Sequence, residues 1–330
     1  MVMATKNLPR RKKVEKGSSV AGFFYVGLAV AACFAALAVN RYIDAKEAEA
    51  KQPLATDVYV VSYPKSGNNW LRFLLGHLYL YGQRNYRSLD FHTIEELIPD
   101  LEYGQVRKHF ENYGKPRLFK SHQPLAAGAG VPCDQTVGVM EAHACLCPNC
   151  PEHWARALVL VRDGRDVMCS YFHFQVQLKL VPENTTFAEF LETPMYPGYN
   201  WAEHTRSFLH ARGTPGRDFH LIRYEDLQAA PAATLAEAAA WAGLPSGPEA
   251  VEWALARSSF GEMRAAEERG GLKLFDRHYA DRNEEFRLTR KGKVGGWAEC
   301  FSSQQSKDIF NKQAADVMKE LGYIVDGEIW

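Results

Sequence analysis

A short polar turn, Tyr63-Pro64-Lys65-Ser66-Gly67-Asn68-Asn69-Trp70, contains the types of residue that bind a phosphate or sulfate group. Gly67 allows the backbone to approach an anion closely, and Lys65 and Ser66 add side-chain donors. The unpaired N–H groups of a following helix would point at the same anion. These residues also suit a plain strand-to-helix connection. Because the Gly-x-x-x-x-Gly-Lys-Ser/Thr spacing of a Walker A loop is missing, an ATP-hydrolysing P-loop enzyme is disfavoured.

Two further segments carry basic side chains. In the first, Arg162 follows an apolar run, and Ser170 comes two helical turns later. Arginine suits phosphate because its planar guanidinium donates two parallel hydrogen bonds. The second segment is Arg290-Lys291-Gly292-Lys293. Taken alone, the first segment also fits a surface ion-pair network, and the second fits a solvated run of charge.

A possible general base lies in Phe119-Lys120-Ser121-His122. A histidine with a pKa near the operating pH can take the proton from a hydroxyl group that acts as a nucleophile. His122 is one of 11 histidines, however, and most histidines in proteins are structural.

The elements that would position these residues can be read from the hydrophobic pattern. Runs of β-branched and aromatic residues predict strands at residues 57–62, 117–122, 157–162 and 219–223. Helical periodicity predicts helices at residues 68–79, 164–179, 227–242, 247–256 and 304–321. Strands that alternate with helices predict an α/β fold, in which a central parallel sheet is flanked by helices. Ligands bind such sheets beyond the carboxyl ends of the strands, where the polar turn would lie.

Together these segments resemble the cytosolic-type sulfotransferase family over most of residues 57–312. The resemblance implies the sulfotransferase fold, with its P-loop-like nucleotide-binding core. It also implies transfer of the sulfuryl group of 3′-phosphoadenosine 5′-phosphosulfate (PAPS) to a hydroxyl of an alcohol, phenol or other small acceptor. No metal is required for this reaction.

The resemblance also assigns roles to residues. The implied donor-binding residues are Lys65, Ser66, Gly67, Asn68, Asn69 and Trp70 in the turn, Arg162, Ser170, Arg290, Lys291 and Gly292 around the 3′-phosphate, and Tyr224, Ser258, Phe260 and Met263 near the adenine, which Trp70 also flanks. His122 would be the general base. Lys65 would stabilise charge on the departing phosphate, with Lys120 near the transferring group.

The chain departs from the family pattern in several places. Asn68-Asn69 replaces the common Thr-Thr, and Gly295-Gly296-Trp297 replaces Gly-Asp-Trp. Asparagine can also donate hydrogen bonds, so we expect donor binding to survive. The family's short dimerisation pattern is not evident around residues 298–308, which leaves the oligomeric state open.

The N-terminal part predicts a membrane anchor. We expect a basic cytosolic tail at residues 1–19, a transmembrane helix at 20–39, a stem at 40–56 and the sulfotransferase domain at 57–330. The chain would then be a single-pass type II membrane protein, with its catalytic domain in the Golgi lumen. Asn184-Thr185-Thr186 is an N-glycosylation acceptor compatible with this location. A cleaved signal peptide and a buried helix are the alternatives for the apolar segment.

Cysteine spacing and charge limit the other possibilities. Cys133, Cys145, Cys147 and Cys150 gather in a segment at about 133–150 that has no counterpart in the family pattern. Disulfides, a zinc site and free thiols are all compatible with this spacing. The formal net charge is zero, so no overall field favours nucleic acid as a partner.

Three other functions compete with the main hypothesis. A Golgi carbohydrate sulfotransferase would share the donor and the fold but act on glycans. A non-catalytic, membrane-anchored nucleotide-binding or scaffold protein would have no need of both Lys65 and His122. A nucleotide or small-molecule kinase is the third alternative.

Overall fold

The computed structural model describes residues 41, 54, 56–101, 116–125, 156–193, 198–270, 282 and 286–325. Nearly all of these belong to one compact unit, Pro53–Trp330. In these ranges no helix combines the length and the apolar character needed to cross a membrane. The expected span at residues 20–39 and the cysteine-rich segment at 133–150 lie outside the described residues.

In the part of the chain that the structure describes, four short strands form one parallel sheet in the order β2-β1-β3-β4. The strands are β1 Val58–Val61, β2 Leu118–Ser121, β3 Arg156–Val161 and β4 Asp218–Arg223. In the centre of the sheet, Tyr59 lies opposite Phe119 on one side and Ala157 on the other. The parallel sheet and its four predicted strands are therefore confirmed.

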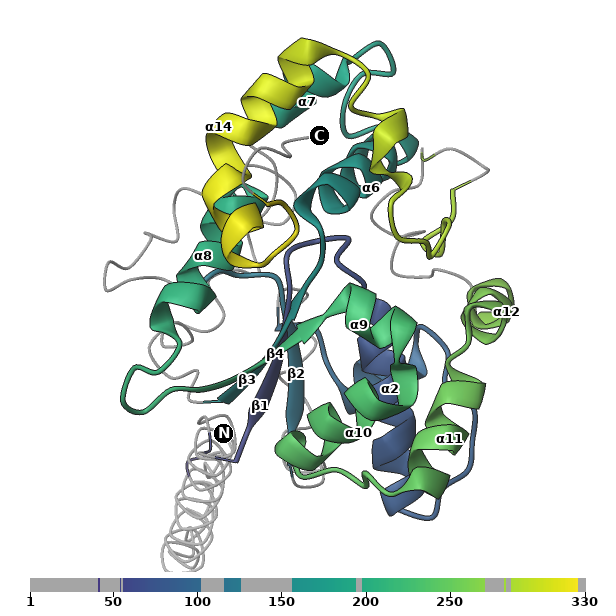
Figure 1. The fold of residues 1–330 in the computed structure, drawn as a ribbon. Helices are drawn as coiled ribbons and strands as arrows, with labels where there is room; N and C mark the ends of the chain where they lie inside the picture. Colours follow the sequence, from purple (N-terminus) through teal and green to yellow (C-terminus); the bar gives the residue numbers. More distant parts are fainter. Residues whose placement is uncertain are drawn as a thin grey trace, which may run out of the picture. The chain divides into compact units, whose positions relative to one another are not determined.

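Helices cover both faces of the sheet (Figure 1). One face packs against α6 Gly164–Gln177, α7 Phe187–Glu192, α8 Trp201–Ala211 and α14 Gln304–Glu320. The other packs against α2 Asn68–Gly82, α3 Thr93–Leu97, α9 Tyr224–Ala229, α10 Pro231–Ala242, α11 Pro248–Arg257 and α12 Phe260–Gly270. Side chains of β1 alternate between the two cores, with Val61 in the first and Val60 in the second.

One predicted helix is divided in two. The helix expected over residues 227–242 is α9 followed by α10, because the chain leaves helical geometry at Ala230 (φ −135°, ψ 61°). Pro231 then begins α10, where its missing N–H group is not needed. The other predicted helices are present with small shifts at their ends.

The carboxyl ends of the four strands lie along one edge of the sheet, since all strands are parallel. Beyond β1 comes the polar turn, beyond β2 His122, beyond β3 Arg162, and beyond β4 Tyr224. β1 connects to β2 on one side, and its neighbour β3 connects to β4 on the other, so a topological switch point lies between β1 and β3 at this edge. The fold therefore gathers the polar turn and three predicted site residues from distant parts of the sequence.

Candidate active site

The turn after β1 has a backbone shape that depends on glycine. Gly67 has φ 104° and Lys65 has φ 67°, both in the left-handed region. A Cβ atom at Gly67 would lie 2.6 Å from the Tyr224 ring, so a larger residue does not fit without movement. Among the described residues no side chain caps α2, and the first N–H groups of this helix face the turn.

The polar side chains of the turn differ in their hydrogen bonding. Ser66 is buried, and its Oγ has no hydrogen-bond partner in the part of the chain described. Asn68 is also buried, but its Nδ2 donates to the Val60 carbonyl at 3.3 Å and to Ser62 Oγ at 3.1 Å. The Asn68 amide thus fastens α2 to β1, while Asn69 lies half-buried beside it in the first turn of the helix.

Lys65 lies in a cationic and poorly hydrated environment. Its Nζ is 4.2 Å from the centre of the Phe174 ring. Burial, together with the nearby charges of Arg290 and Arg162, lowers the pKa of Lys65 to about 7, against an opposing effect of Glu267. An anionic ligand would relieve this repulsion, so the site favours negative charge.

Arg162 joins three of the predicted segments. Its Nη1 donates to the Lys65 carbonyl at 3.3 Å, and its Nη2 donates to the Lys293 carbonyl at 2.8 Å. The guanidinium stacks over the Tyr224 ring at 4.5 Å. The turn, the end of β3 and the C-terminal basic segment therefore form one continuous site.

The basic segment after residue 289 is held by a carboxylate. Arg290 Nη1 lies 3.0 Å from Glu299 Oε1, and Lys291 Nζ lies 2.5 Å from Glu299 Oε2. Gly292 has φ 59°, and its carbonyl accepts a hydrogen bond from Gln228 at 3.3 Å. Glu299 and Gln228 were not predicted, because neither belongs to a recognisable motif.

The residues expected around the adenine fall into two groups. Trp70 and Tyr224 make an edge-to-face contact with ring centres 5.6 Å apart, and Phe260 is 47% exposed beside Gly292. Ser258 and Met263 lie in the interior. Ser258 Oγ is 2.9 Å from Nδ1 of His77, a buried histidine that the motifs did not reveal. Burial lowers the pKa of His77 to about 4, which keeps this ring neutral.

His122 follows β2 and is oriented by the neighbouring strand. Its Nδ1 lies 2.6 Å from the Ser62 carbonyl, which can only accept a hydrogen bond. This contact selects the tautomer that carries its proton on Nδ1 and its lone pair on Nε2. Lys120 forms a buried ion pair with Asp100, whose Oδ2 is 2.6 Å from Lys120 Nζ.

Ser170 and Asp166 share α6. Ser170 is buried on this helix, two turns after Arg162. Asp166 Oδ2 accepts hydrogen bonds from Arg162 Nη2 at 3.3 Å and from the Gly295 N–H at 2.8 Å. Arg162 and Asp166 are four residues apart, and this spacing indicates the first of these contacts. The ion-pair network that the sequence allows for this segment is also present.

The arrangement suits a ligand that carries several negative charges. Three cationic side chains converge, and the buried polar atoms without hydrogen-bond partners in the described part of the chain include Ser66 Oγ, Asn68 Oδ1, Arg162 Nε and Arg290 Nε. Buried polar atoms usually have partners, so this grouping indicates a ligand site. The predicted donor-binding residues fit a phosphorylated nucleotide on this basis.

Comparisons with known proteins identify the family of this chain. The family described as "Sulfotransferase domain" matches residues 55–129 and 143–322. The amine sulfotransferase of Oryctolagus cuniculus is 25% identical over 270 residues, which cover 80% of this chain and 81% of the relative. Human sulfotransferase 2A1 is 26% identical over 274 residues, covering 80% and 86%.

Solved structures show the same fold at lower sequence identity. Retinol dehydratase in complex with androsterone and the inactive cofactor PAP has a TM-score of 0.56 and 19% identity, over 83% of this chain and 84% of the other. Mouse sulfotransferase SULT7A1 complexed with PAP has a TM-score of 0.52 and 19% identity, over 82% and 90%. The match over most of the chain shows that it belongs to the sulfotransferase family and is a sulfotransferase, an enzyme whose donor in this family is PAPS.

Proposed function

We propose that this enzyme transfers the sulfuryl group of PAPS to a hydroxyl group of a small acceptor, with His122 as the general base. The observation that carries the proposal is the convergence of Lys65, Arg162 and Arg290 at buried polar atoms that have no hydrogen-bond partner among the described residues. Complexes of the neighbouring folds with PAP support the choice of donor.

The donor would bind across the carboxyl edge of the sheet. Ser66, the N–H groups of α2 and Lys65 would face the 5′-phosphosulfate. Arg162, Ser170 and the Arg290-Lys291-Gly292 segment would surround the 3′-phosphate. Trp70, Tyr224 and Phe260 offer aromatic surfaces for the adenine. Ser258 and Met263 would support this pocket from the interior, where Ser258 contacts His77 and Met263 packs in the hydrophobic core.

The transfer needs one base and one stabilised leaving group. The acceptor oxygen attacks sulfur while its proton passes to Nε2 of His122, the atom that carries the lone pair. The bond between sulfur and the bridging oxygen breaks, and that oxygen keeps the electron pair. Lys65 and the N–H groups of α2 stabilise the charge that develops there. Lys120, paired with Asp100, would lie near the transferring group, on the strand that leads to His122.

We also propose that the enzyme is anchored by residues 20–39 and works in the Golgi lumen. The uncharged apolar stretch supports an anchor, and Asn184 is exposed where a glycan could attach. A disulfide between Cys169 and Cys300 fits an oxidising compartment. Protease protection of the catalytic domain in intact microsomes tests this assignment; digestion without detergent would refute it.

Donor binding is tested by titrating the full-length chain with PAP, 3′-phosphoadenosine 5′-phosphate, in a calorimeter. Arg162→Ala should weaken binding by about 10- to 100-fold, because it removes a charge-assisted contact worth about 1.5–3 kcal/mol. Arg206→Ala, which breaks the surface pair with Asp316, is the matched control and should bind like the wild type. Equal affinity in all three proteins would refute the donor site.

A further inference from the structure

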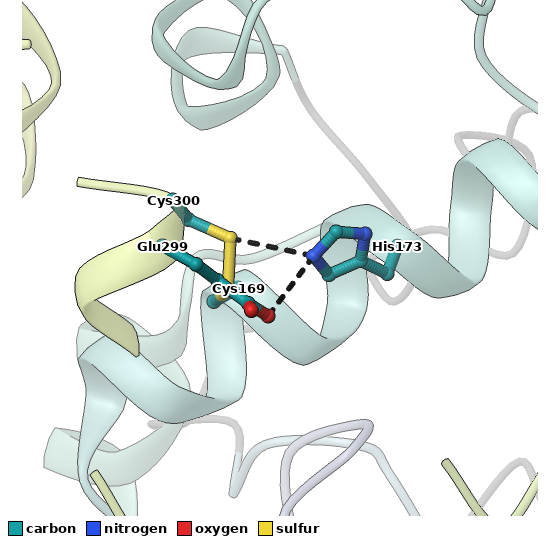
Figure 2. Close-up of side chains that lie close together, drawn as sticks. All are labelled: Cys169, His173, Glu299 and Cys300. Carbon is teal, nitrogen blue, oxygen red and sulfur yellow. Dashed lines mark hydrogen bonds and ion pairs between the residues drawn. A yellow bond between two sulfur atoms is a disulfide. The ribbon is translucent and has the colours of Figure 1, made fainter. Parts of the chain in front are cut away.

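A disulfide outside the predicted cysteine cluster joins two parts of the donor site. Cys169 on α6 is bonded to Cys300, which follows the short 3-10 helix η4 Gly296–Glu299. The two cysteines are 131 residues apart in sequence, and their Cα atoms lie 5.6 Å apart. Figure 2 shows the bond together with His173 and Glu299.

These four side chains resemble a metal site but do not form one while the bond is intact. Their potential ligand atoms all lie within 4.8 Å of one another. Zinc would be held by cysteine thiolates, whereas both sulfur atoms are bonded to each other. In the disulfide form, His173 and Glu299 are the remaining ligands, which are too few for a structural zinc site.

Glu299 connects the disulfide to the donor-binding cations. This residue directly precedes Cys300, and its carboxylate contacts Arg290 and Lys291 at 3.0 Å and 2.5 Å. His173 Nε2 lies 3.3 Å from the same carboxylate (Figure 2). The hydrogen bond from Lys291, followed by the interactions with Arg290, lowers the pKa of Glu299 to about 2, so the carboxylate stays charged.

The position of Glu299 depends on how η4 is attached to α6. The N-terminal end of η4 is held by the hydrogen bond from the Gly295 N–H to Asp166. The middle of η4 is held by stacking of Arg165 on Trp297 at 4.5 Å. The C-terminal end of η4, which carries Glu299, is held by the disulfide. Because Glu299 is 37% exposed, its ion pairs alone would fix its position only weakly.

We propose that the Cys169–Cys300 disulfide and Glu299 form a clamp that positions Arg290 and Lys291 for the 3′-phosphate of the donor, so that donor affinity depends on the disulfide. The inference rests on the proposed function. Cys169 directly precedes Ser170 on α6, so the clamp links both sides of the proposed 3′-phosphate site. Without it, the donor must order the basic segment as it binds.

The clamp opens by thiol–disulfide exchange. A dithiol attacks one sulfur atom, and the sulfur–sulfur bond of Cys169 and Cys300 breaks. Two electrons and two protons pass to the two cysteines, while the dithiol closes into its own disulfide. Glu299 then remains attached through its ion pairs alone.

The test is calorimetry of the full-length chain with PAP before and after treatment with dithiothreitol. We expect reduction to weaken binding about tenfold, the effect of losing one well-placed charge-assisted contact. The Cys169→Ala/Cys300→Ala variant should bind as weakly as the reduced wild type and show no response to the dithiol. A chain with serine at Cys133, Cys145, Cys147 and Cys150 should keep the full response, which separates the clamp from the other cysteines.

A second variant tests the clamp with the disulfide intact, in case the double variant does not fold. Glu299→Gln should raise KM for PAPS about tenfold and leave kcat at saturating donor unchanged, with Glu299→Asp restoring part of the affinity. Glu320→Gln removes an exposed charge at the end of α14 and should have no effect. Unchanged affinity after reduction and in Glu299→Gln would overturn the clamp, whereas absence of PAP binding by the oxidised wild type would overturn the proposed function.

Discussion

The low pKa of Lys65 predicts that donor binding weakens as pH rises. In the free enzyme, burial together with Arg290 and Arg162 lowers this pKa from its ordinary 10.5 to about 7. The dianionic end of the donor should raise it again, because opposite charge favours the protonated amine. Below pH 7 the amine is charged before binding, so affinity is at its maximum. Above pH 7 binding must take up a proton, and affinity falls about tenfold per pH unit.

The size of the effect follows from the fraction of protonated Lys65. With a pKa of about 7, half of the free enzyme carries the proton at pH 7, and about 1% carries it at pH 9. Affinity for PAP should therefore fall by about 50-fold between these values, as long as the pKa in the complex exceeds 9. Calorimetry in buffers of different ionisation enthalpy should also show uptake of nearly one proton at pH 9.

The matched control is Lys65→Arg, since arginine keeps its charge over this range. This variant should bind PAP with little pH dependence between pH 7 and 9. If it shows the same slope as the wild type, then another group causes the pH dependence. If the wild type itself shows no slope, the low pKa of Lys65 is wrong.

Two predictions concern the shape of the polar turn and the stability of the fold. Gly67→Ala should reduce PAP affinity at least tenfold, because the φ of 104° at residue 67 and a Cβ atom 2.6 Å from the Tyr224 ring would force the turn to move. A circular dichroism spectrum like that of the wild type would show that the fold survives. Asp57→Ala should destabilise the fold by about 3–5 kcal/mol in urea unfolding, because it breaks the buried 2.6 Å ion pair with Arg117. Asp316→Ala, in an exposed pair, should cost less than about 1 kcal/mol, and equal losses in the two variants would refute the argument from burial.

The sheet and the main motifs could be predicted because their signals are local. Apolar runs ending in polar residues marked the strands, and the parallel order then placed the polar turn and Arg162 at one edge. The division of the helix at 227–242 also had a local signal, Pro231, which the periodicity of the flanking residues concealed.

The remaining features depend on contacts between distant parts of the chain. The role of the Asn68 amide in fastening α2 to β1 could not be predicted from the turn motif. The bond between Cys169 and Cys300 and the ion pair between His173 and Glu299 join segments more than 120 residues apart, for which spacing gives no pattern. Ser258 likewise pairs with a histidine on a helix far earlier in the sequence.

The most direct test of the central claim is transfer of radiolabelled sulfate from PAPS to a panel of alcohols, phenols and glycans by the full-length enzyme. The wild type and His210→Ala, an exposed histidine at the end of α8, should both sulfate at least one acceptor. His122→Ala should lose at least about 100-fold in kcat and keep its PAP affinity, as expected for loss of a general base. Full turnover by His122→Ala, or no transfer by a wild type that binds PAP, would contradict the proposed mechanism.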